Sequence, residues 1–79
     1  MEHLNLDLRV RRWRKAAGLT QQRLARLVGV SPITVCFWET ARTQPTPENI
    51  ERIASAVDVS VRIFFGELPP EPKKRGRAA

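Results

Sequence analysis

Residues 20–40 constrain the fold more than any other part of the chain, because they predict two short helices joined by a tight turn. Thr20 is a good N-cap, and Gly29 can end a helix in the left-handed conformation without a Cβ penalty. Ser31 can cap a second helix that has Pro32 at its first position, where a missing N–H costs nothing. The stretch therefore predicts a helix, a sharp turn and a second helix in direct succession.

The two helices are expected over residues 21–28 and 32–40, each with an apolar side at helical spacing. The expected inward-facing residues are Leu24, Ala25, Leu27, Val28, Val35 and Trp38. The outward face of the second helix is expected to carry Ile33, Phe37 and Thr40. One side of this helix should therefore pack on a core while the other stays accessible.

Three more helices are predicted from caps and periodicity. The first covers residues 6–17 and carries the stripe Leu6, Val10, Trp13 and Ala17. The fourth starts at Pro47 behind the cap Thr46 and carries the stripe Ile50, Ile53, Ala54 and Val57. The fifth is short and covers residues 61–65. The expected fold is all-α, with five helices in one domain over residues 1–67.

Composition fits one small domain of 79 residues that is 42% hydrophobic, enough for a modest core. The single cysteine cannot form an internal disulfide, which favours a reducing, cytoplasmic setting. No apolar run approaches the roughly 18 residues needed to span a membrane. The N-terminal residues also lack the pattern of a signal peptide. We expect no membrane partner.

The formal net charge is +6. A balance this basic favours a polyanionic partner, with nucleic acid ahead of a membrane surface. The prolines that follow residue 67 favour an extended spacer, and residues 68–79 are expected to form this spacer and a basic disordered tail. The tail bases are Lys73, Lys74, Arg75 and Arg77. We expect these bases either to attract DNA without sequence preference or to form an arm that binds the minor groove.

The chain resembles the phage-repressor/Cro-like (XRE-type) family of bacterial and phage helix-turn-helix DNA-binding proteins. The residues that carry this resemblance are Leu19-Thr20-Gln21, Ala25 where the two helices cross, Gly29-Val30-Ser31, and Val35-x-x-Trp38-Glu39. The resemblance implies a lambda-repressor-like domain that binds double-stranded DNA, with the second and third helices as the helix-turn-helix.

In such a domain the helix over residues 32–40 is the recognition helix of the major groove. The base contacts implied are Pro32, Ile33, Thr34, Cys36 and Phe37, and the phosphate contacts are Gln21, Thr40, Arg42, Thr43 and Arg12. An ion pair between Arg14 and Glu39 would tie the first helix to the recognition helix. Ile63 and Phe65 would lie in a homodimer interface.

Two positions depart from the family pattern. Ala41 stands where relatives usually carry Gly, so it either adopts a left-handed turn or lets the helix continue. The recognition helix offers Ile33 and Phe37 where many relatives have hydrogen-bonding side chains. This apolar face allows three interpretations: a T-rich site read through methyl groups, shape and phosphates; a protein-binding face; or a domain that has lost DNA binding.

The chain shows no arrangement typical of an enzyme. It has no Gly-rich phosphate loop, no GxSxG and no Cys/His metal spacing, so we expect no catalysis, no cofactor and no metal site. The function predicted is a sequence-specific transcriptional regulator of the repressor, controller or antitoxin type, acting as a homodimer in a bacterial nucleoid or phage-infected host. A toxin or another regulator is a possible protein partner. The alternatives are a protein-interaction module that uses the Ile33/Phe37 face, or nonspecific DNA binding led by the tail.

Overall fold

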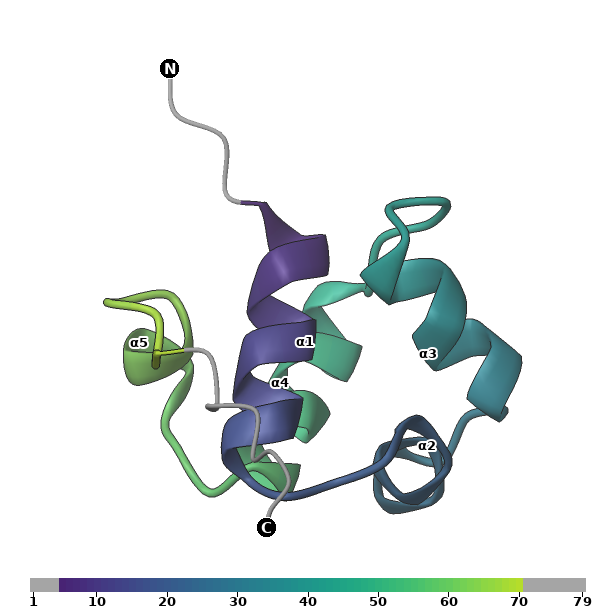
Figure 1. The fold of residues 1–79 in the computed structure, drawn as a ribbon, viewed down its shortest axis with the longest axis horizontal. Helices are drawn as coiled ribbons and strands as arrows, with labels where there is room; N and C mark the ends of the chain where they lie inside the picture. The colour runs from purple at the N-terminus through teal and green to yellow at the C-terminus, as the bar shows by residue number, and fades with distance from the viewer. Residues whose placement is uncertain (1–4, 71–79) are drawn as a thin grey trace, which may run out of the picture.

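The computed structural model describes residues 5–70, which form five helices and no strand (Figure 1). The helices are α1 (Leu6–Ala16), α2 (Gln21–Val28), α3 (Pro32–Glu39), α4 (Pro47–Ala56) and α5 (Val61–Phe64). The predicted all-α, five-helix fold is therefore confirmed. None of the helices in this part of the chain is both long enough and apolar enough to cross a membrane.

Side-chain caps start four of these helices, as the sequence predicts. The hydroxyl oxygens of Thr20, Ser31, Thr46 and Ser60 each accept a hydrogen bond from the backbone N–H three residues later. Each such bond satisfies one of the N–H groups that the first helical turn leaves without a partner. The helix starts are therefore fixed by local chemistry.

The core lies between α1, α2, α3 and α4, and α5 closes it from one end. Its fully buried large side chains are Val10, Leu24, Val35, Ile53 and Phe64. Helix α2 packs against α3 and α4, and α1 packs against α3. Helix α5 lies at the opposite end of the molecule from the α2–α3 pair (Figure 1).

Two expected core residues lie on the surface. Leu27 is 53% exposed, because the buried side of α2 is formed by Leu24, Ala25 and Val28, and position 27 is turned about 100° away from it. Ala17 is exposed because α1 ends at Ala16 and Ala17 is its C-cap. The Leu27 prediction was wrong because the buried arc of α2 is narrower than its apolar stripe in the sequence, and the Ala17 prediction was wrong because α1 ends one residue earlier than expected.

Polar groups of α1 hold α5 and the segment that follows it. Arg9 Nη1 donates to the carbonyls of Phe64 (3.1 Å) and Gly66 (2.7 Å), and Trp13 Nε1 also donates to Phe64 (3.1 Å). The Trp13 ring stacks on Phe64, with ring centroids 6.5 Å apart. A four-residue helix is too short to be stable alone, so these contacts explain why α5 forms.

Candidate nucleic-acid interface

The turn between α2 and α3 sets the direction of α3. Gly29 has φ +90°, and its N–H donates to the carbonyl of Ala25 at 2.8 Å. Val30 packs against the core, and Ser31 then starts α3. The left-handed Gly29 ends α2, so that α3 can start only three residues later, at Pro32.

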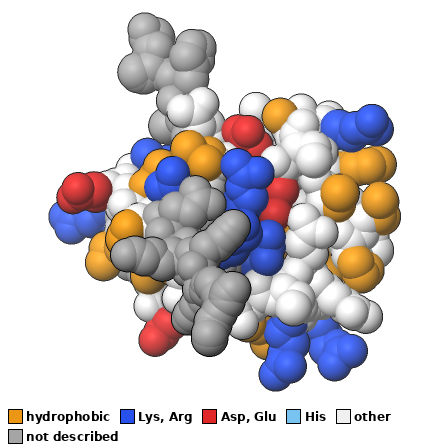
Figure 2. All heavy atoms as spheres, viewed as in Figure 1, with side chains coloured by type: hydrophobic (Ala, Val, Ile, Leu, Met, Phe, Trp, Pro, Cys, Tyr) orange, Lys and Arg blue, Asp and Glu red, His pale blue; other side chains and the backbone are white. Residues whose placement is uncertain are grey.

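Helix α3 is divided into a buried face and an open face. Val35, Trp38 and Glu39 are buried, whereas Ile33 is 56% exposed and Pro32 is exposed beside it. Figure 2 shows hydrophobic side chains gathered on the right-hand side of the molecule, where α3 lies in Figure 1. The predicted base-reading residues Thr34, Cys36 and Phe37 are half-buried along the same helix.

Few hydrogen-bonding groups remain available on the open face of α3. The hydroxyls of Thr34 and Ser31 bond each other at 3.0 Å, and Ser31 also accepts from the Thr34 N–H. Thr40 donates its hydroxyl hydrogen to the carbonyl of Cys36 at 2.9 Å. The surface that α3 presents to a partner is therefore mostly hydrocarbon.

A buried carboxylate joins three helices behind this surface. Glu39 of α3 forms an ion pair with Arg14 of α1, with Nε–Oε2 at 2.6 Å and Nη2–Oε1 at 3.0 Å. The side-chain amide of Gln21, at the start of α2, donates to the same carboxylate at 2.9 Å. Arg14 also donates to the carbonyl of Leu19. The ion pair implied by the family resemblance is thus present, and Gln21 braces α3 through it.

The loop after α3 places a cation beside the open face. Ala41 has φ +63°, so of the two conformations expected for it the left-handed one occurs. The N–H groups of Arg42 and Thr43 then donate to the carbonyl of Phe37 at 2.9 and 3.3 Å. The Arg42 guanidinium lies over the Phe37 ring, 5.3 Å from its centroid, which is a cation–π contact.

This stacked pair is the feature that sequence reasoning missed. An aromatic residue and an arginine five positions apart do not share a helix face. Only the left-handed residue between them brings them together. The Gly usual at position 41 in the resembled family was the one available signal.

The predicted phosphate contacts fall into two groups. Gln21, Thr40, Arg42 and Thr43 gather around the C-terminal end of α3, because Gln21 bonds Glu39, the neighbour of Thr40. Arg12 lies apart from them, and its Nη1 donates to the carbonyl of Pro69 at 3.1 Å. The tail residues Lys73, Lys74, Arg75 and Arg77 lie outside the described residues.

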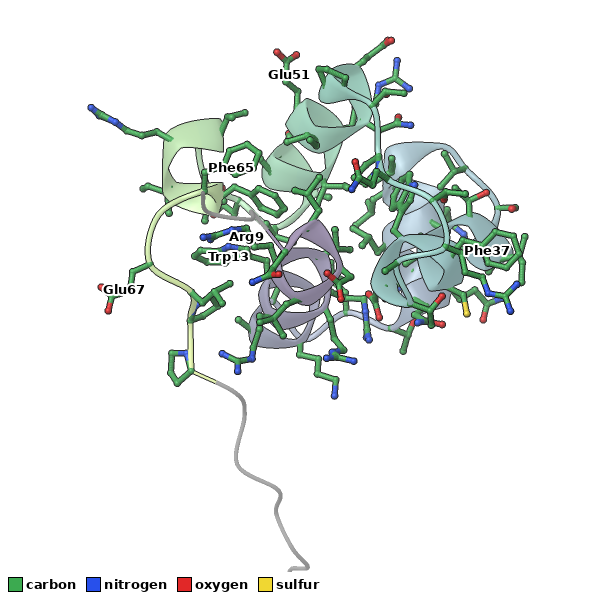
Figure 3. All side chains as sticks on the ribbon, turned by 90° about the horizontal axis from the view of Figure 1, so that it is seen from above. Arg9, Trp13, Phe37, Glu51, Phe65 and Glu67 are labelled. Atoms are coloured by element: carbon green, nitrogen blue, oxygen red, sulfur yellow. The ribbon has the colours of Figure 1, made fainter. Side chains whose placement is uncertain are left out.

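The predicted dimer residues lie far from α3. Ile63 of α5 is 51% exposed, and Phe65 is half-buried against Phe64 with the rings edge to face. Figure 3 shows Phe65 on the side of the molecule opposite Phe37. Beside Ile63 runs an open groove of about 550 Å³ between α4 and α5, lined in part by Glu51, Asp58 and Val61.

A protein family and several solved structures are similar to this chain. The helix-turn-helix family matches residues 10–64. The DNA-binding domain of the P22 c2 repressor is similar, with 30% identity, a TM-score of 0.77, and coverage of 87% of this chain and 92% of that one. The restriction-modification controller C.AhdI from Aeromonas hydrophila has 32% identity, a TM-score of 0.72, and coverage of 78% and 94%. The DNA-binding domain of SinR from Bacillus subtilis has 26% identity, a TM-score of 0.71, and coverage of 82% and 96%. None of the curated proteins compared with the chain matches it.

Proposed function

Because the chain belongs to the helix-turn-helix family of Cro/C1-type DNA-binding proteins, we propose that it is a sequence-specific transcriptional regulator with α3 in the major groove. The observation that carries this proposal is the open face of α3. Ile33 and its neighbours contribute little to the core, while Glu39 fixes the helix from behind through α1 and α2. A rigid helix with a free outer face is what reading base edges requires.

Phosphate contacts would come from the groups around that helix. The N-terminus of α2, at Gln21, has free N–H groups that attract an anion. Thr40, Arg42 and Thr43 lie near Gln21 at the C-terminal end of α3 and would add contacts to the DNA backbone there. Arg12 and the tail bases would add charge that does not depend on sequence.

A homodimer is the assembly that we propose. Ile63 and Phe65 would pack across a two-fold axis, with the groove between α4 and α5 receiving the partner's α5. Charge supports this pairing, because exposed Arg62 stands on α5 while Glu51 and Asp58 line the groove. The two recognition helices would then reach half-sites about 34 Å apart.

The kind of regulator is proposed from similar proteins. The P22 c2 repressor has been solved in complex with a synthetic operator, C.AhdI is a restriction-modification controller, and SinR has been solved in complex with the protein SinI. A repressor, controller or antitoxin role fits a domain of this size, with a toxin or second regulator as a further partner. We place its action on DNA in the cytoplasm, in a nucleoid or a phage-infected host.

The second candidate function is a protein-interaction module that grips its partner with Ile33 and Phe37. The exposure of Ile33 on a mostly hydrocarbon surface favours it. A third candidate is nonspecific DNA binding led by the tail. These functions differ in how binding responds to salt and to DNA sequence.

Selection of bound duplexes from a random pool tests the proposal. We expect a two-fold symmetric motif whose affinity falls steeply as salt rises. Arg42→Ala should weaken binding to all sequences and lower the salt slope by about one, whereas Arg52→Ala, an exposed arginine of α4, should change neither. Binding without a motif would favour the tail-led function. No binding at low salt would reject DNA as the partner and favour a protein.

A further inference from the structure

The open face of α3 presents carbon where a base edge presents hydrogen-bonding groups. Pro32 and Ile33 are exposed and Phe37 is half-exposed. The hydroxyls nearest to them, on Thr34 and Thr40, are already engaged with Ser31 and with the Cys36 carbonyl. No side chain of α3 on this face can therefore make a bidentate hydrogen bond to a base, and the nearest group that could is Arg42 in the loop beside it.

Only one group on the major-groove edge of DNA is apolar. It is the methyl carbon at C5 of thymine, which cytosine lacks unless it is methylated at the same atom. A hydrocarbon surface gains more free energy by covering that methyl than by covering the smaller C5–H of an unmethylated pyrimidine at the same place. The apolar face of α3 and the apolar methyl group are therefore complementary.

Phe37 is held in place before any DNA arrives. Its carbonyl accepts from the N–H groups of Arg42 and Thr43, and the Arg42 guanidinium covers one face of its ring. Figure 3 shows Phe37 at the outer side of the helix pair, away from α5. The backbone bonds fix the Phe37 backbone and the Arg42 contact favours one position of the ring, so burying a methyl against the ring costs less side-chain entropy than it would with a free side chain.

We infer that α3 selects pyrimidines methylated at C5, so that 5-methylcytosine can replace thymine at the positions it contacts. This inference rests on the proposed DNA-binding function. It adds that cytosine methylation of a site strengthens binding. One fully buried methyl group corresponds to about a fourfold change in affinity, and two to about fifteenfold.

The test uses the full chain and the duplex selected above. Thymines of the motif are replaced by deoxyuridine, which removes only the methyl groups, and thymines are separately replaced by cytosine or 5-methylcytosine opposite guanine. We expect the deoxyuridine duplex to bind at least tenfold more weakly. We also expect 5-methylcytosine to recover several-fold of the affinity lost with cytosine.

Two variants assign this effect to α3. Ile33→Ala should show a clearly smaller difference in affinity between the thymine and deoxyuridine duplexes than the unmodified chain. Leu27→Ala should preserve the full difference, because Leu27 is as exposed as Ile33 (53% against 56%) but stands on α2. Both positions are on the surface, so neither substitution should unfold the domain.

Three results would overturn the inference. Equal binding of the thymine and deoxyuridine duplexes by the unmodified chain would reject it and leave the DNA-binding function standing. A symmetric motif without thymine would do the same. Binding of neither duplex would reject both the inference and the proposed function.

Discussion

Ala41 has a backbone conformation that shapes the proposed DNA-binding surface. Its φ of +63° disfavours an L-residue by about 1–2 kcal/mol, because Cβ approaches the following carbonyl. The turn it makes directs the N–H groups of Arg42 and Thr43 to the Phe37 carbonyl. The strained backbone of Ala41 is therefore what positions Arg42.

Replacing Ala41 with Gly should stabilise the domain. The left-handed penalty disappears, and the greater freedom of Gly in the unfolded chain offsets about 0.5–1 kcal/mol of that gain. We expect up to about 1 kcal/mol more stability and a Tm several degrees higher, measured by thermal unfolding. Ala16→Gly, in the last turn of α1, should instead lower the Tm. Equal losses in the two variants would contradict the strain at Ala41.

At the scale of helices, Glu39 of α3 connects this helix to α1 and α2. Glu39 is only 5% exposed, and its carboxylate binds both Arg14 and Gln21. Removing one partner of such a pair leaves a buried charge without compensation, which costs about 3–5 kcal/mol. That is a large share of the stability expected for a domain this small.

Glu39→Ala and Arg14→Ala should each destabilise the domain by about 3 kcal/mol, measured by denaturant unfolding. The double variant should lose clearly less than the sum, because the second substitution removes the uncompensated charge. Glu48→Ala, which breaks the exposed Glu48–Arg52 pair of α4, should cost less than about 1 kcal/mol. Additive losses at Glu39 and Arg14 would show that the two side chains act independently.

The helices and their caps could be predicted because their signals are local. Thr20, Ser31, Thr46 and Ser60 each act within one turn, and the predicted helix starts match the structure. The expected ends of α1, α3 and α5 each lie one residue beyond the observed ends, because all three finish in a turn that continues the helical spacing.

Contacts between distant residues could not be predicted in the same way. Arg12 was expected to contact phosphate, yet it donates to the carbonyl of Pro69. Arg9 likewise donates to the carbonyls of Phe64 and Gly66. Nothing in the spacing of residues more than 50 positions apart indicates such bonds. The Arg14–Glu39 pair was foreseen only through the family resemblance.

Over the whole molecule, the proposed DNA face and the proposed dimer face lie at opposite ends. Phe37 and Phe65 mark these two ends in Figure 3. A change at α5 should therefore alter assembly without touching α3 directly. Two linked recognition helices bind far more tightly than one, because the second contact is made at high effective concentration.

Ile63→Arg should convert the proposed dimer into monomers, measured by sedimentation, and should weaken binding to a symmetric site by about a hundredfold. Its unfolding should change little, because Ile63 is 51% exposed. Ile63→Val should retain the dimer. An unchanged sedimentation coefficient for Ile63→Arg would place the dimer contact elsewhere.

The two faces of α3 have a consequence for how this chain can change over generations. Val35, Trp38 and Glu39 hold the helix from behind, and Ile33 faces outward. Substitutions at the outer positions can therefore alter target choice at little cost in folding. A single substitution at an outer position of α3 can therefore change which target is bound while the protein still folds.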